Sequence, residues 1–188
     1  MKNWLLMGAL LVLSAGAATA DTLQLSFNDR SAQLGYRYFL MEDDFGSTVL
    51  GGRLLYNEKE ETTLGSLGVE FIGEPGNIAG LDLGFGARLY GGRADHRQEL
   101  LVLTIGTTAD YFPPMLGGLG VFGEIFYGPK IFSTLDAERL LETSVAIGYA
   151  ATPRVRVHLG YQNIRTKFED TGTWTIDEAL RIGFTARF

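Results

Sequence analysis

The sequence predicts an all-β fold, an antiparallel transmembrane β-barrel of about ten strands, with eight strands as the alternative. Three observations predict it. Apolar and polar residues alternate along most of the chain after residue 20, which is the period of a strand with two different faces. Glycine accounts for 25 of 188 residues, about 13% against a usual 7%. The final segment alternates as far as a terminal aromatic residue, Phe188.

The first twenty residues predict a secretory signal peptide. Lys2 supplies a positive start, Leu5 to Ala15 an apolar stretch, and Ala18-Thr19-Ala20 a small-residue cleavage site. The apolar stretch is too short for a spanning helix, which needs about 20 residues, so a membrane anchor is the weaker alternative. We therefore expect a signal peptide over 1–20 and one barrel domain over 21–188.

The composition argues against several classes of protein. A formal charge of −6, or −7 without Lys2 (−6 − 1), disfavours a nucleic-acid partner, which calls for a basic surface. The absence of cysteine excludes a disulfide framework, a thiolate metal site and an acylated N-terminal cysteine. No apolar run after residue 21 approaches 18 residues, which disfavours a helical membrane protein. We expect no metal and no cofactor.

Ten segments carry the alternation. In the clearest, Leu83, Phe85 and Ala87 alternate with Gly84 and Gly86, so one face suits lipid and the other a lumen. Many segments end in Tyr or Phe, as expected for an aromatic girdle at the headgroups. The interval 119–127 fits least well, because it also places Phe residues on the interior face. The expected lipid-facing segments are 23–27, 34–38, 50–56, 67–71, 81–89, 101–111, 121–127, 145–149, 157–161 and 180–188.

The connections alternate between two kinds, as the two ends of a barrel require. One kind is short and rich in Pro and Gly, as in periplasmic turns, and the other is polar and charged, as at the outer face. The alternative, a soluble secreted β-sandwich that binds a ligand, is disfavoured by glycine-rich polar faces and aromatic strand ends. The first kind comprises Met41–Gly46, Glu74–Gly80, Pro113–Gly118 and Ala151–Arg154, and the second Asn28–Arg30, Asn57–Glu61, Arg93–Glu99, Lys130–Arg139 and Glu169–Thr173.

The last strand matches the pattern of an outer-membrane assembly signal. That pattern has a polar residue (Arg181), a glycine two positions later (Gly183), and alternating apolar residues (Phe184, Ala186) that end on an aromatic residue (Phe188). A strand with an open edge is ready to pair with another chain, so we expect the barrel assembly machinery as a partner. Ala186 departs from the pattern, which usually has a larger apolar residue there.

The stretches Leu23-Gln24-Leu25-Ser26, Asp136-Ala137-Glu138-Arg139 and Leu159 to Arg165 (LGYQNIR) resemble the YfaZ family of Gram-negative outer-membrane proteins. The resemblance runs over residues 21–188. It implies an outer-membrane barrel with a structural or porin-like role, and no catalytic residues.

The interior face is predicted to carry balanced charge. Six acidic and six basic residues fall on it, together with one histidine that could switch its charge. Barrels of this size have interiors that side chains fill, so we prefer a packed ionic lumen to a narrow solute path. The residues are Arg37, Arg53, Glu70, Asp82, Arg88, Asp110, Glu124, Glu142, Arg156, His158, Asp177, Arg181 and Arg187.

Two further hypotheses concern the rim and catalysis. Cations such as Arg93, Lys130 and Lys167 could attract lipopolysaccharide phosphates, although acidic residues share the rim and favour a salt-bridged surface. A lipid-modifying or proteolytic enzyme could use His96 or His158, the latter with Ser144 and Glu142, but oxyanion donors and nucleophile-elbow glycines are missing. We therefore predict a non-enzymatic barrel among outer-membrane lipids and lipopolysaccharide.

Overall fold

A computed structural model describes residues 21–43, 45–76, 78–94, 98–168 and 172–188. The predicted signal peptide, His96 and its neighbour Asp95 lie outside these ranges. Within them the chain is almost entirely β-strand, and no helix is long and apolar enough to cross a membrane.

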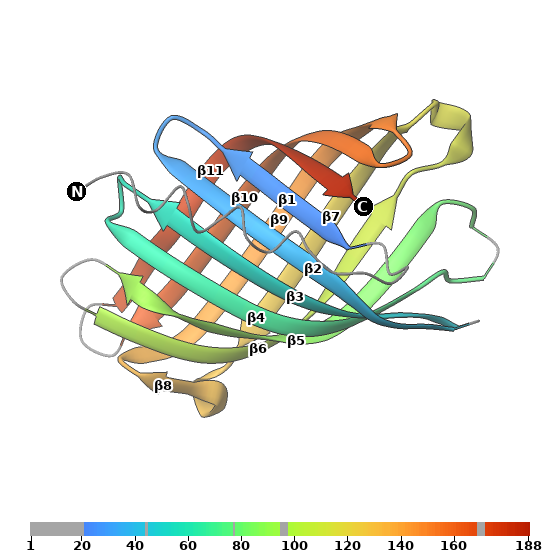
Figure 1. Ribbon diagram of the computed structural model, residues 1–188. Helices are drawn as coiled ribbons and strands as arrows, with labels where there is room; N and C mark the ends of the chain where they lie inside the picture. The colour runs from blue at the N-terminus through green and yellow to red at the C-terminus, as the bar shows by residue number, and fades with distance from the viewer. Residues whose placement is uncertain (1–20, 44, 77, 95–97, 169–171) are drawn as a thin grey trace.

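Ten strands form one closed antiparallel ring (Figure 1), as the sequence predicted. Each pairs with its neighbours in the order β1, β2, β3, β4, β5, β6, β7, β9, β10 and β11, and β11 pairs with β1 to close the ring. The strands are β1 (Thr22–Phe27), β2 (Ser31–Asp43), β3 (Gly46–Asn57), β4 (Thr62–Gly73), β5 (Leu81–Ala94), β6 (Gln98–Tyr111), β7 (Leu119–Gly128), β9 (Ala137–Thr152), β10 (Val155–Phe168) and β11 (Gly172–Arg187).

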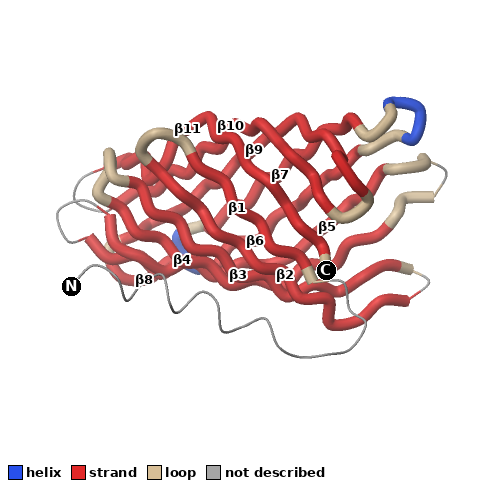
Figure 2. The backbone as a smooth tube through the Cα atoms, turned by 45° about the horizontal axis from the view of Figure 1, so that its top comes forward, coloured by secondary structure: helices blue, strands red, loops and turns tan. Residues whose placement is uncertain are grey.

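The connections gather at the two ends of the barrel (Figure 2). We call the end that holds Asp21 and Phe188 the terminal end and the opposite end the loop end. At the terminal end the backbone N–H of Phe188 donates to the Asp21 carbonyl at 3.0 Å, which joins the first and last described residues. The turns predicted to be periplasmic lie at this end, and the charged connections lie at the loop end.

The outward face is apolar, as the alternation predicted. Residues of the ten expected lipid-facing sets are exposed or half-exposed, among them Leu54, Leu67 and Ile147, each more than 60% exposed. A closed ring satisfies the backbone hydrogen bonds of every strand, and closed rings and helices are the structures that can span a bilayer. The exposed apolar face is therefore the lipid-facing surface of a transmembrane barrel.

The strands extend well past the predicted segments, so several predicted turn bounds were wrong. β2 continues to Asp43 and β9 to Thr152, inside the expected turns at 41–46 and 151–154. Likewise β5 ends at Ala94 and β11 begins at Gly172. Beyond the lipid layer the two faces of a strand no longer differ in solvent, so alternation fades while backbone pairing continues.

The expected loop 130–139 was also wrong in part. It holds a short 3-10 helix, η3 (Lys130–Phe132), the three-residue strand β8 (Ser133–Leu135), which pairs with β6, and the start of β9. At the terminal end a second 3-10 helix, η2 (Pro114–Leu116), occupies the predicted turn at 113–118.

Candidate functional site: the barrel lumen

The interior of the barrel has three layers between its two ends. An apolar plug lies toward the loop end, a layer of ion pairs lies below it, and a cavity of about 650 Å³ with charged and apolar lining residues reaches the terminal end. The lining of the cavity includes Phe45, Glu74 and Arg154 from the terminal-end turns.

The apolar plug was not predicted. It is a cluster of interior side chains near the loop ends of seven strands, and Trp174 packs against it. The signal in the sequence is a local loss of alternation, where apolar residues occupy both faces, as at Leu54-Leu55 and Leu140-Leu141. The plug consists of Leu55, Leu64, Tyr90, Leu100, Val102, Ala137, Leu140, Ile164, Phe168 and Ile176.

A β-bulge brings β11 into the plug. The register of β10 against β11 shifts between Ile164, opposite Asp177, and Arg165, opposite Thr175, which leaves Ile176 as the extra residue. A bulge reverses which residues face inward. Ile176 and Asp177 are consequently both buried in the interior, one in the plug and one among the charges.

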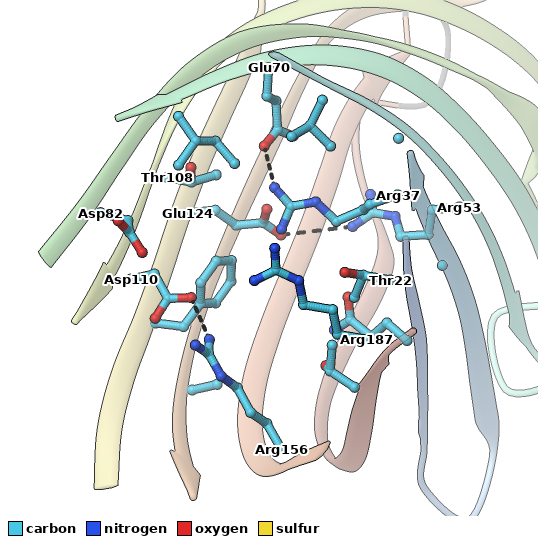
Figure 3. A pocket seen from close by; sticks show the side chains of 18 of the residues that line it. Thr22, Arg37, Arg53, Glu70, Asp82, Thr108, Asp110, Glu124, Arg156 and Arg187 are labelled. Atoms are coloured by element: carbon cyan, nitrogen blue, oxygen red, sulfur yellow. Dashed lines mark hydrogen bonds and ion pairs between the residues drawn. The ribbon is translucent and has the colours of Figure 1, made fainter. Parts of the chain in front are cut away.

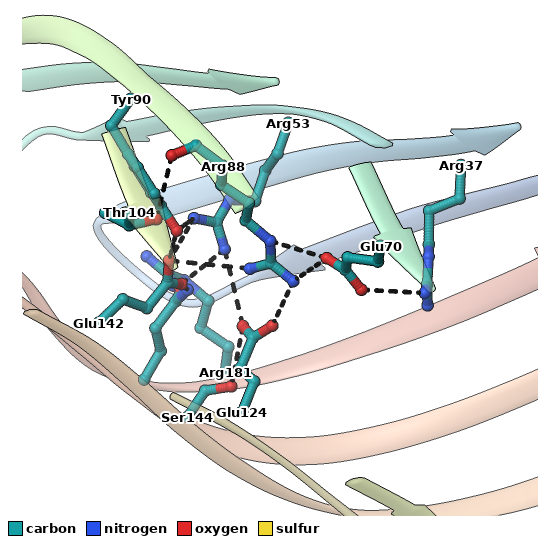
Figure 4. A network of polar contacts seen from close by, with 11 residues as sticks. Arg37, Arg53, Glu70, Arg88, Tyr90, Thr104, Glu124, Glu142, Ser144 and Arg181 are labelled. Atoms are coloured by element: carbon teal, nitrogen blue, oxygen red, sulfur yellow. Dashed lines mark hydrogen bonds and ion pairs between the residues drawn. The ribbon is translucent and has the colours of Figure 1, made fainter. Parts of the chain in front are cut away.

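The ion layer consists of Arg53, Glu70, Arg88, Glu124 and Glu142 (Figure 4). Arg53 donates to both oxygens of Glu142, from Nη1 to Oε1 at 2.6 Å and from Nη2 to Oε2 at 2.7 Å. Arg88 donates from Nη2 to Glu70 Oε1 at 2.5 Å and to Glu124 Oε2 at 2.7 Å. Arg53 thus joins β3 to β9 across the lumen, and Arg88 joins β5 both to its neighbour β4 and to the non-adjacent strand β7.

Polar groups complete the coordination of Glu142, which is fully buried. The Tyr90 hydroxyl donates to Oε2, and Gln162 Nε2 donates to Oε1 at 2.5 Å. A buried carboxylate is tolerated only when its oxygens are paired and hydrogen-bonded. Glu142 satisfies this condition with four donors from three other strands.

A second buried cluster surrounds Arg181. Its Nη2 donates to Asp177 Oδ1 at 2.7 Å and to the Ser31 hydroxyl at 2.9 Å, and Nη1 donates to Gln162 Oε1. Asn57 Nδ2 also donates to Asp177 Oδ1, at 2.9 Å. Gln162 therefore links this cluster to Glu142 in the ion layer.

Glycines make room for these large side chains. A Cβ on Gly106 would lie 2.5 Å from the ring of Phe126, and one on Gly68 would lie 2.5 Å from Arg88 Cγ. The guanidinium of Arg88 stacks on the Phe126 ring, 3.7 Å from its centroid. Glycine on the interior face thus lets a charged or aromatic neighbour lie flat against the sheet.

The cavity is lined by charges on opposite walls (Figure 3). Asp82 and Asp110 lie on one side, where Arg156 Nη1 donates to Asp110 Oδ2 at 3.0 Å. Arg37 and Arg187 lie on the other side. Among the described residues, Asp82 and Arg187 form neither an ion pair nor a side-chain hydrogen bond.

The structure places all thirteen predicted lumen charges inside the barrel. Glu142 and Asp177 are buried in the ion layer and the Arg181 cluster, and the other eleven residues line the cavity. Of the five residues of the predicted assembly signal, Arg181 and Gly183 face the interior, while Phe184 and Phe188 are exposed on the outside. Ala186 pairs with Leu23 and Val155 on the same outer row.

The grouping of Ser144, His158 and Glu142 is not a catalytic triad in this structure. Ser144 Oγ donates to Glu124 Oε1 at 3.1 Å, and the four donors around Glu142 do not include His158. A triad requires the histidine to join the hydroxyl and the acid. Within the described ranges, no group of three or more His, Asp or Glu residues is arranged to hold a metal ion.

No family model and no curated protein sequence matches the chain. Two solved outer-membrane proteins are similar in structure. The KdgM porin has a TM-score of 0.45 at 14% identity, over 91% of this chain and 99% of the porin. Neisserial surface protein A has a TM-score of 0.37 at 14% identity, over 90% of this chain and 94% of that protein. By its closed ring, apolar exterior and charged lumen, the protein has the fold of a transmembrane β-barrel of the outer-membrane type.

Proposed function

We propose that the protein is a porin-like barrel whose lumen is closed to steady solute flow, with a cavity that opens to the periplasm at the terminal end. The observation that carries this proposal is the pair of layers between the cavity and the loop end. The apolar plug supports it because its members Leu55, Tyr90, Phe168 and Ile176 are almost fully buried.

The chemistry of each layer favours closure. A hydrophobic constriction excludes water and hence the ions that water carries. The ion layer below it contains both signs of charge, and its arginines and glutamates contact one another at 2.5 to 2.8 Å. A selective channel is expected to present a ring of one sign to a solvated path instead.

We infer the cellular context from the sequence. Residues 1–20 act as a signal peptide that is removed near Ala20, and the strand ending on Phe188 is recognised by the barrel assembly machinery. Both chain ends then lie in the periplasm, and the loop end faces lipopolysaccharide. The resemblance to the YfaZ family supports the same location.

Conductance tests the closed lumen directly. Purified protein is inserted into planar bilayers in parallel with a general porin as the positive control. We expect no steady current from this protein under conditions in which the porin conducts. A steady open-channel current comparable to that of the porin contradicts the proposal.

Cysteine labelling tests which side the cavity faces. The chain has no cysteine, so each introduced thiol is unique. Thr185 lines the cavity, Thr104 is fully buried, and Lys59 is exposed at the loop end. In intact cells a membrane-impermeant maleimide should label Lys59→Cys alone, and in isolated, opened envelopes Thr185→Cys as well. Thr104→Cys is the control for a filled interior and should stay unlabelled. Labelling of Thr185→Cys in intact cells contradicts the proposal.

A further inference from the structure

We propose that the cavity at the terminal end binds a small dipolar solute, one that carries an anionic group and an ammonium group. The anionic group lies against Arg37 and Arg187, and the ammonium group against Asp82. This inference rests on the proposed function, because a cavity closed at its inner end retains a ligand rather than passing it on.

The cationic wall is a row across three strands. Thr22 on β1 lies directly opposite Arg37 on β2 and directly opposite Arg187 on β11. Residues paired in this way have side chains on the same face at about 4.5–5.5 Å between Cβ atoms. Two guanidinium groups therefore flank one hydroxyl group at the mouth of the cavity (Figure 3).

Neither guanidinium in this row is fully neutralised. Arg187 has no carboxylate partner among the described residues, and its guanidinium lies 5.4 Å from the centroid of the Phe39 ring. Arg37 reaches Glu70 Oε2 at 3.4 Å, while Arg88 binds the other oxygen of Glu70 at 2.5 and 2.8 Å. Paired arginines beside a hydroxyl group suit a carboxylate or phosphate, which they can hold bidentately.

The anionic wall lies across the barrel. Asp82 on β5 is directly opposite Asp110 on β6. Arg156 binds Asp110, but Asp82 has no such partner in the part of the chain that the structure describes. In the ring of ten strands β6 is five positions from β1 in either direction, so the two walls face each other.

This arrangement favours a ligand with both charges. A simple anion drawn to the arginines also meets the field of the two aspartates, and a simple amine drawn to Asp82 meets the arginines. A dipolar solute of the right length satisfies both walls at once, and opposite charges on low-dielectric walls strengthen the field between them. The length of the ligand is therefore the main determinant of its affinity.

Calorimetric titration of the folded, detergent-solubilised protein tests whether a dipolar solute of one particular length binds best. The probes are ω-amino carboxylates of increasing chain length, with the alkylamine and the alkyl carboxylate of each length as single-charge controls. We expect one length to bind at least about tenfold more tightly than either of its controls, which corresponds to about 1.4 kcal/mol of binding free energy. If no length exceeds its controls, the inference is wrong.

Variants identify the walls. Arg187→Gln and Asp82→Asn should each reduce the affinity for the dipolar probe to that of a single-charge control. Arg187→Lys should retain only part of the preference, because it keeps the charge but loses the bidentate geometry. The matched control is Arg30→Gln, which removes an exposed arginine at the loop end. Each variant is first shown to migrate as a folded barrel on unheated gels. A preference that survives in both Arg187→Gln and Asp82→Asn contradicts the inference.

The two proposals fail separately. A steady bilayer current with intact dipolar preference overturns the closed lumen and leaves the binding site standing. A silent bilayer without that preference overturns the binding site alone.

Discussion

Arg53 on β3 and Glu142 on β9 form a bidentate ion pair across the lumen, with N–O distances of 2.6 and 2.7 Å. In the ring of ten strands β3 and β9 are five positions apart in either direction, so the pair joins opposite walls. It lies directly beneath the apolar plug, because Tyr90 belongs to the plug and also donates to Glu142. This ion pair thus spans the lumen at the level where the cavity meets the plug.

Removing the charge of Glu142 should destabilise the barrel strongly. In Glu142→Gln the buried Arg53 loses its bidentate partner and keeps the longer contact to Glu124 at 3.8 Å, and breaking a buried pair costs about 3–5 kcal/mol. Urea unfolding in lipid or detergent measures the free energy of unfolding. The double variant Arg53→Met/Glu142→Leu should recover much of the loss, since no charge is left unpaired. A double variant no more stable than Glu142→Gln contradicts this account.

Shortening a side chain in the apolar plug should lower the free energy of unfolding more than shortening one on the lipid-facing surface. Phe168 is fully buried, so Phe168→Ala leaves a cavity and should lower the free energy of unfolding by about 3–5 kcal/mol. Phe184, which is 43% exposed toward lipid, is the matched control. Phe184→Ala should cost less because lipid chains fill the space. Equal losses in the two variants, measured in the same urea series, count against a packed plug.

Alanine substitutions at interior glycines should destabilise the barrel to different extents, according to the space beside each glycine. A Cβ on Gly106 would lie 2.2 Å from the Ile125 carbonyl oxygen, whereas one on Gly51 would meet nothing closer than Arg37 Cγ at 4.0 Å. Overpacking costs about 1–3 kcal/mol, so Gly106→Ala should be destabilised by that amount and Gly51→Ala little changed. The measurement is the urea midpoint of each variant. If Gly106→Ala unfolds at the same urea concentration as Gly51→Ala, the prediction is wrong.

Phe188 should matter for assembly more than for stability. Its side chain is 51% exposed, so Phe188→Ala loses little packing, but we expect less folded protein in the outer membrane because assembly recognises the last strand. The measurement is the heat-modifiable fraction in outer-membrane preparations. Phe27→Ala, at an aromatic residue of similar exposure on β1, is the control. Equal assembly of the wild type and Phe188→Ala removes the support for the signal.

The sequence predicted the barrel because the evidence for it is local. Alternation along each strand specifies an outer and an inner face without knowledge of the partner strand. Leu83 could therefore be assigned to the lipid-facing side and Arg88 to the lumen. Strand ends were less predictable. Pairing continues beyond the lipid layer, where β9 reaches back to Ala137 although its apolar alternation begins near Val145.

The plug shows where local patterns fail. Leu55 and Ile176 lie inside, but an isolated segment does not reveal whether an apolar residue on the interior parity is an exception or part of a layer. Ile176 depends in addition on the bulge in β11, which shifts the register by one residue. Only the closed ring brings the loop ends of seven strands together to form the layer.

The sequence by itself determined the class of fold and which charged residues face the lumen, because both follow from a period of two along the chain, and it favoured ten strands over eight. Only the tertiary structure decided which charges meet, since Arg53 and Glu142 are 89 residues apart and face each other through barrel closure and strand register. It also decided which charges remain unpaired. Arg187 on β11 and Asp82 on β5 lie on opposite walls of the ring and do not pair with each other. The cavity therefore has a positively charged wall and a negatively charged wall.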